Sequence, residues 1–351
     1  MNKLLMFFSG ILVLFSTQVY SQNSWQLKGY GLAHLSLDSV DDGQDSNIHT
    51  ASNSSRLGIN GQYSLTNGVN VIFQYESGVD LTGQGENDGN GEANSAGQIF
   101  TKTRPSYVGL KGRLGKIVIG HMPALDQWAN DYNLFADQVG DLGNLWEGSG
   151  VPGRMDNTLH YASPDFNGFD FAFTYQAKEH NQDQDNFIFK ANFLHRNVTL
   201  GIAYASIGQS YGFDEHQVVA ATIGYRRKNY TLGGGYQLEH DISGISGHHR
   251  ESFTLGASMH WNSHSTVKAQ FAITKGEFQQ SDASQIAVGY DYALTEKTNL
   301  YIAYAYMNNE QAVSFSVNGK GHGDKIIPLL GDDPRALSIG IVTKFDISFS
   351  G

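Results

Sequence analysis

Hydrophobic and polar residues alternate with a period of two along most of the chain from Trp25 onward. In residues 56–65, RLGINGQYSL, leucine, isoleucine and tyrosine alternate with arginine, asparagine, glutamine and serine. In residues 198–206, VTLGIAYAS, the large residues alternate with small ones. Successive side chains of a strand point to opposite faces, so this period predicts β-strands with one apolar face and one small or polar face.

Sixteen such segments occur along the chain. They start near Gln26, Ser54, Val69, Phe100, Lys116, Asn157, Phe169, Phe187, Val198, Gln217, Tyr230, Glu251, Thr266, Ser284, Asn299 and Arg335. Tight turns such as Asn67-Gly68 alternate with long hydrophilic connections, as in an up-and-down barrel whose two ends face different environments. A β-sandwich would not explain the many tyrosines at strand ends, which fit aromatic girdles at two membrane interfaces. The pattern therefore predicts an all-β fold, a 16-stranded antiparallel transmembrane β-barrel.

The first residues have the features of a secretory signal peptide. Lys3 precedes an apolar run over residues 4–15, and a polar stretch with small residues leads to Ser21. We expect residues 1–21 to be removed and residues 22–351 to form one barrel. No other stretch of about eighteen apolar residues occurs, which excludes a helical membrane protein and leaves a secreted soluble protein or an outer-membrane barrel.

Composition narrows the chemistry. The formal net charge of -11 excludes a nucleic-acid partner, whose phosphates require a basic surface. Cysteine is absent, so neither disulfides nor thiolate metal sites are available. Three of the thirteen histidines, His240, His248 and His249, share one connection without the spacing of metal ligands. We expect no metal and no cofactor.

The segment from Met122 to Gly153 is long, irregular and acidic, and it lies between two strand patterns. Its carboxylates are Asp126, Asp131, Asp137, Asp141 and Glu147, and its apolar anchors are Trp128, Tyr132, Leu134, Phe135 and Trp146. Long loops inside a compact domain are usually functional, and disordered acidic loops are poor in aromatic residues. The segment is therefore predicted to pack against a wall of the barrel.

The chain resembles the trimeric general porins of Gram-negative outer membranes. The similar stretches are residues 54–78, 101–120, 153–175 and 331–345, which are spread over nearly the whole mature chain. The resemblance implies a barrel whose third long loop folds inward and narrows the pore, with its acidic side chains facing basic residues on the opposite wall. That loop corresponds to the Met122 segment.

The resemblance also implies which residues line the constriction. They are Tyr30, Arg56, Lys102, Arg104, His121, Asp126, Asp131, Asp137, Asp141 and Arg154. The alternation independently puts Arg56 on the polar face of its strand. Tyr30 and His121 stand where related porins often have basic residues, so we expect a less positive constriction and a weak preference for cations.

The resemblance implies a homotrimer in the outer membrane, in contact with lipid and lipopolysaccharide, that lets ions and small hydrophilic solutes diffuse passively. Porins usually end in an aromatic residue, whereas here Phe345 is followed by DISFSG. Alternation continues through Ile347 and Phe349. We therefore expect a longer last strand that faces lipid and pairs with the first strand near residues 27–35.

Other functions fit the sequence less well than a non-specific channel does. No nucleophile-elbow or comparable catalytic signature is present, so we do not expect an enzyme. An adhesin or receptor would also use long loops, but an inward acidic loop opposite arginines favours a pore. A substrate-selective channel remains open as an alternative.

Overall fold

A computed structural model describes residues 24–65, 68–82, 100–101, 104–123, 133–146, 153–178, 185–209, 212–319, 321–323 and 326–351. The predicted signal peptide lies outside these residues. Over the described residues, no helix has the length and apolar character needed to cross a membrane.

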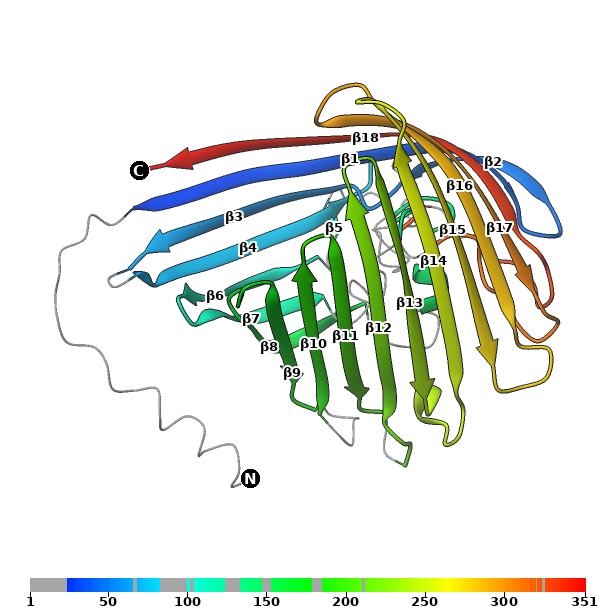
Figure 1. The fold of residues 1–351 in the computed structure, drawn as a ribbon, viewed down its shortest axis with the longest axis horizontal. Coiled ribbons are helices and arrows are strands. Elements are labelled where there is room, and N and C mark those ends of the chain that lie inside the picture. Colours follow the sequence, from blue (N-terminus) through cyan, green and yellow to red (C-terminus); the bar gives the residue numbers. More distant parts are fainter. Residues whose placement is uncertain are drawn as a thin grey trace.

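Strands make up most of the described chain (Figure 1). The strands of the first half are β1 (Trp25–Asp41), β2 (Ser46–Ser52), β3 (Arg56–Ser64), β4 (Asn70–Val79), β5 (Phe100–Thr101), β6 (Ser106–Gly112), β7 (Gly115–Pro123), β8 (Arg154–Ala162) and β9 (Phe169–Gln176). The second half holds β10 (Asn186–His195), β11 (Val198–Ile207), β12 (His216–Arg227), β13 (Tyr230–His240), β14 (Arg250–His260), β15 (Ser265–Gly276), β16 (Ala283–Ala293), β17 (Thr298–Asn309) and β18 (Arg335–Ser350). Two short helical segments, α2 (Gly143–Trp146) and η3 (Ile242–Gly244), lie in connections.

The strands close into one antiparallel barrel. Each strand pairs with its sequence neighbour, and β1 pairs with β18, so that no edge remains open around the ring. Both β2 and β3 pair with β1, and both β5 and β6 pair with β4. Each of these two pairs of segments is one interrupted barrel strand, so the eighteen segments make sixteen strands. This confirms the predicted fold.

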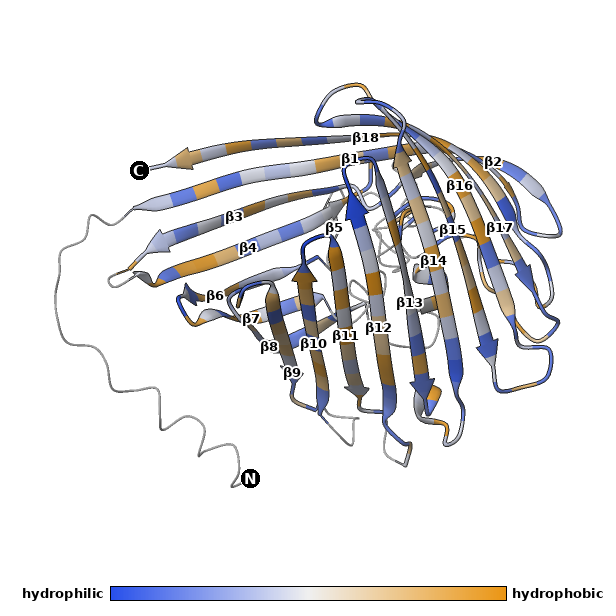
Figure 2. Cartoon of the chain, viewed as in Figure 1, coloured by the Kyte–Doolittle hydropathy of each residue, from blue (hydrophilic) through white to orange (hydrophobic). Residues whose placement is uncertain are grey.

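The period-two pattern separates the two faces of the wall. On β12, Val219 and Ile223 are exposed on the outer surface, whereas Val218 and Ala220 are buried on the inner side. Figure 2 shows the same alternation of hydropathy along neighbouring strands. Apolar side chains exposed on the outside of a closed barrel are the surface that lipid covers. The predicted lipid face is therefore present.

The last strand, β18, extends beyond its neighbour β17. β18 pairs with β1 as far as Gln26↔Ser350, while its pairing with β17 ends at Thr298↔Thr343. In Figure 1 the C-terminus lies beside the start of β1. Phe345, Ile347 and Phe349 share the exposed outer face. The expectation of a longer last strand, paired with the first, is confirmed.

Candidate functional site

The β7–β8 loop, of which residues 133–146 are described, is packed inside the barrel. Phe135, Leu142 and Leu145 are fully buried in one cluster with small side chains of the wall, including Ala287 on β16 and Ala305 on β17. Several inward-facing residues of these two strands are small, which leaves room for the larger side chains of the loop. Burying each such side chain stabilises the docked loop by about 1.5–3 kcal/mol. The predicted docking against a wall is therefore present.

Gly140 brings the backbone of this loop close to the wall. Its φ is +88°, and a Cβ at this position would lie 2.5 Å from the Cβ of Ala287. Only glycine takes up such a position without strain. Polar groups then fix the loop, since Gln270 accepts from the Leu134 N–H at 3.0 Å and Lys268 Nζ donates to Gln138 Oε1 at 3.0 Å.

A second segment, the β17–β18 loop, is also folded inward over its described residues 310–319, 321–323 and 326–334. Its Val317 carbonyl accepts from the Gly140 N–H at 2.7 Å, and Asn318 forms a β-bridge with Val139. Further along the same loop, fully buried His322 lies 3.0 Å from the Asp38 carboxylate of β1. The two loops therefore pack on each other inside the barrel.

The break between β2 and β3 receives the β17–β18 loop. Asn53 Oδ1 accepts from the Gly323 N–H at 2.7 Å, and Ser54 Oγ donates to the Gly321 carbonyl at 3.0 Å. These side chains bond to the loop where the strand ladder is interrupted, and Ser54 has a positive φ of 50°. The interrupted strand thus serves as a docking point.

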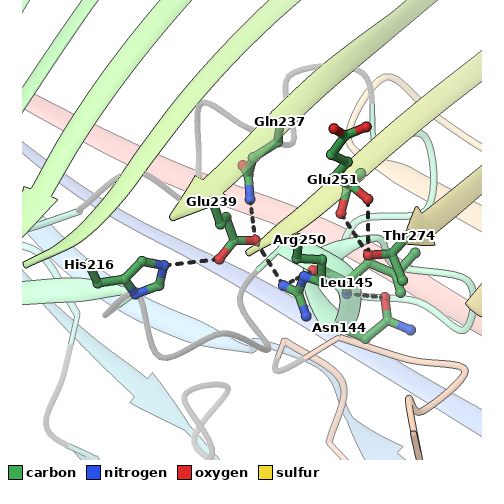
Figure 3. A network of polar contacts seen from close by, with 9 residues as sticks. Asn144, Leu145, His216, Gln237, Glu239, Arg250, Glu251 and Thr274 are labelled. Atoms are coloured by element: carbon green, nitrogen blue, oxygen red, sulfur yellow. Dashed lines mark hydrogen bonds and ion pairs between the residues drawn. The ribbon is translucent and has the colours of Figure 1, made fainter. Parts of the chain in front are cut away.

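A buried charge network joins the β7–β8 loop to the wall formed by β12–β14 (Figure 3). Arg250 donates to Glu239 Oε1 at 2.9 Å and to the Leu145 carbonyl at 2.7 Å. Its guanidinium lies over the Phe315 ring of the β17–β18 loop, 5.4 Å from the centroid. Glu239 is fully buried, and its second oxygen lies 3.1 Å from His216 Nε2. One arginine therefore contacts both inward loops.

Three arginines from separate parts of the wall lie together near the tip of the β7–β8 loop. Arg56 begins β3, Arg104 precedes β6 and Arg154 begins β8. The charges of Arg56, Arg154, Asp137 and Glu76 all act on the Arg104 guanidinium.

Two carboxylates face this arginine cluster. Asp137 Oδ2 of the loop lies 4.0 Å from Arg56, and Glu76 Oε1 of β4 lies 3.7 Å from Arg104. Tyr30 donates to Glu76 Oε2 at 2.9 Å. Arg104 is 6% exposed, so it acts on the lumen mainly through its field, whereas Arg56 and Asp137 are partly exposed.

Asp141 is turned into the loop rather than towards the arginines. It accepts from the backbone N–H groups of Asp137 and Gly143, both at 2.8 Å, and from the Asn133 amide. Burial, and then the charge of Asp137, raise the pKa of the Asp141 carboxyl to about 7. Asp141 therefore shapes the loop, and Asp137 presents the charge.

His121 is not brought to the arginine cluster. Val118 and Met122, two alternate residues of β7, are buried on the inner side, and His121 shares the other face with Ile117 and Ile119. There its Nδ1 lies 2.6 Å from the Asp156 carboxylate. The other predicted constriction residues, Lys102, Asp126 and Asp131, lie outside the described residues.

Sequence reasoning missed Glu76, Arg250 and the inward course of the β17–β18 loop. Glu76 shares the polar face of its strand with Asn70 and Gln74, so the alternation was a signal for it. Arg250 begins its strand, where no local signal separates a lumen charge from a solvated one. Residues 308–333 read as an ordinary hydrophilic connection. Its buried residues, which include Val317, His322 and Ile326, are spaced too irregularly to predict docking.

The arrangement is suited to filtering solutes. Opposite charges across a narrow, partly desolvated passage create a transverse field, and each charge there is weakly screened. Across the described parts of the chain, no cluster of three or more His, Cys, Asp or Glu side chains is arranged to hold a metal ion.

Comparison with known proteins agrees with this geometry. The family model described as Gram-negative porin matches residues 9–312. Outer membrane porin protein 32 of Delftia acidovorans is 26% identical over 314 residues, covering 83% of this chain and 84% of that protein. The major outer membrane protein P.IB of Neisseria gonorrhoeae is 26% identical over 321 residues, covering 82% and 85%.

Among solved structures, the anion-selective porin from Comamonas acidovorans has a TM-score of 0.77 and 23% identity. The match covers 92% of this chain and 100% of that chain, and it supports the fold. The family model spans most of the sequence and the barrel is closed. The chain therefore belongs to the Gram-negative porin family, and it is an outer-membrane porin that forms a channel for the passive diffusion of ions and small hydrophilic solutes.

Proposed function

We propose that the constriction of this porin favours small anions over cations. The observation that carries the proposal is the charge balance near the loop tip. Among the described residues, three guanidinium groups, those of Arg56, Arg104 and Arg154, stand against two carboxylates, those of Glu76 and Asp137. This sign is opposite to the weak cation preference expected from the sequence.

The positions of two carboxylates support the preference for anions. Asp141 adds little negative charge to the passage, because it is buried and bonded within its own loop. Glu76 is engaged by both Arg104 and Tyr30. The name of the Comamonas porin, anion-selective, agrees with the same reading.

The biological unit that we propose is a homotrimer surrounded by outer-membrane lipid and lipopolysaccharide, with residues 1–21 as its signal peptide. The exposed apolar outer face supports contact with lipid, and one of the similar solved structures, an outer-membrane protein of Vibrio cholerae, is described as a trimer form. Conductance in steps of three would support three pores per unit. We infer that the protein acts as a channel and not as an enzyme, because the matching family model and the similar curated proteins are porins.

Reversal potentials across a KCl gradient test the selectivity. Wild type should prefer chloride, and Arg56→Gln or Arg154→Gln should shift the preference towards potassium. Arg335→Gln is the matched control, because it removes the same charge from an exposed rim residue that pairs with Asp41. A wild-type channel that prefers potassium, or Arg56→Gln and Arg154→Gln variants that behave like the control, would show that the arginine cluster does not set selectivity.

A further inference from the structure

Towards the end of the barrel with the short turns, the lumen wall contains a cavity of about 610 Å³. This end is the periplasmic end in outer-membrane barrels. The cavity is lined by Lys28, Lys111 and Lys116, together with Asn60, Gln74 and Tyr107. Its volume lies in the range of small-molecule sites, about 300–1,000 Å³.

Lys111 and Lys116 are directly opposite each other in the β6–β7 pairing. Both lie on the inner face, because their strand neighbours Leu110 and Ile117 are exposed outside. Like charges at directly opposed positions destabilise a sheet. Within the described ranges no Asp or Glu forms an ion pair with either lysine. An anion bound between them would relieve this repulsion.

Beside the apolar side chains Leu27, Ile72 and Phe73, the lining carries polar groups that can bind hydroxyl groups. Lys116 Nζ is held 5.6 Å from the centroid of the Tyr107 ring, and Tyr107 donates its hydroxyl hydrogen to Gln74 Oε1 at 3.3 Å. With its oxygen engaged, Gln74 presents its amide N–H groups, and Asn60 adds a second carboxamide. Carboxamides beside fixed positive charge offer both a charge partner and directional hydrogen bonds.

We propose that this cavity, the vestibule site, binds a small hydroxylated organic anion such as a sugar phosphate or sugar acid. Lys111 and Lys116 bind the anionic group, and Asn60 and Gln74 bind hydroxyls. This inference rests on the proposed function, since the ligand must be an anion that the pore admits. Solute is then held transiently at the periplasmic mouth, so uptake saturates instead of rising in proportion to concentration.

Single-channel recording at low salt, where charges are weakly screened, tests the site. Glucose 6-phosphate and gluconate should interrupt the current with a saturable dependence on concentration. Neutral glucose at the same concentrations should not. Inorganic phosphate should require at least about tenfold more to reach half block, since it lacks the hydroxyl contacts.

Lys111→Gln should raise the half-blocking concentration of glucose 6-phosphate by about tenfold, the effect of losing one charge-assisted hydrogen bond. Lys111 is exposed in the cavity, so this variant should fold as wild type does. Lys116→Arg keeps the charge and should retain block. Lys228→Gln, in the exposed β12–β13 turn outside the cavity, is the matched control and should leave block unchanged.

The outcomes separate the two proposals. A conducting, anion-preferring channel that shows no saturable block, or equal block in Lys111→Gln and wild type, would overturn the vestibule site and leave the selectivity proposal intact. Equal half-blocking concentrations for inorganic phosphate and glucose 6-phosphate would overturn the role of the carboxamides. A cation-preferring wild type would overturn the proposed function instead.

Discussion

Replacing Arg250 with methionine should loosen both inward loops without changing any charge at the arginine cluster. Methionine keeps much of the length of the side chain but removes the guanidinium that bonds to Glu239 and to the Leu145 carbonyl. It also removes the cation over the Phe315 ring. The substituted position is therefore a shared anchor for the β7–β8 and β17–β18 loops.

The size of the effect of Arg250→Met follows from the loss of two interactions. Glu239 is fully buried, and removing one partner of a buried ion pair costs about 3–5 kcal/mol of folding free energy. The hydrogen bond from the charged Arg250 to the Leu145 carbonyl contributes about 1.5–3 kcal/mol, and this part acts on loop docking alone. A loss of that size raises the population of undocked loop by roughly ten- to a hundredfold.

Single-channel recording detects undocking as excess noise and brief closures of the open channel. Arg250→Met should increase the frequency of these events by one to two orders of magnitude, which follows from the about 1.5–3 kcal/mol above. The temperature at which this variant denatures, followed by its heat-modified electrophoretic mobility, should also fall. The double variant Arg250→Met/Glu239→Leu separates the two effects, since replacing both partners with apolar groups can be nearly neutral for stability. It should recover denaturation temperature yet remain noisy.

Arg335→Met serves as the control, because its partner Asp41 lies at the exposed rim. It should be as quiet as wild type. If Arg250→Met were also quiet and closed at the same voltage as wild type, the loops would be held by their apolar contacts alone, and the anchoring role of Arg250 would be wrong.

Two further predictions concern assembly and pH. Phe349→Asp puts a charge on the lipid face of the last strand, so it should lower the yield of inserted, heat-modifiable barrel; a wild-type yield would mean that the extension beyond Phe345 is dispensable. Because the pKa of Asp141 is raised to about 7 from an unfolded value near 4, the folded protein keeps a proton that the unfolded chain releases between those values. Its contribution is therefore fully present below about pH 4 and is lost as the pH rises towards 7. Denaturation temperatures of wild type relative to Asp141→Asn should fall over that window, and parallel curves would contradict the buried, protonated carboxyl.

The local alternation of hydrophobic and polar residues was sufficient to predict the barrel. A period of two that persists through sixteen segments leaves only a sheet with two different faces, and tight turns alternating with long connections leave only antiparallel neighbours. Phe349 and Ile347 continued the outward face, so the extended last strand could be predicted as well. These features depend on residues that are adjacent in the chain, so they can be predicted from the sequence.

The constriction was only partly accessible from sequence. The aromatic and aliphatic anchors of the Met122 segment predicted a docked loop, and Arg56 lay on the polar face by alternation alone. We expected His121 to face the lumen. Val118 and Met122 of β7 face inward, so the alternation along this strand places His121 on the outer face. A resemblance to a family identifies which residue corresponds to a pore-lining position. The direction in which its side chain points depends on the register of this strand.

Tertiary structure alone decided which distant residues meet. Arg250 contacts Leu145 and Phe315 because the closed ring brings β14 against the ends of two loops that fold into the same lumen. His322 reaches Asp38 because β1 and β18 are neighbours only after closure. The sequence determined the wall, because strand faces are set by neighbouring residues. The packing of the loops inside the wall depends on distances between residues that are far apart in the chain, which only the closed barrel fixes.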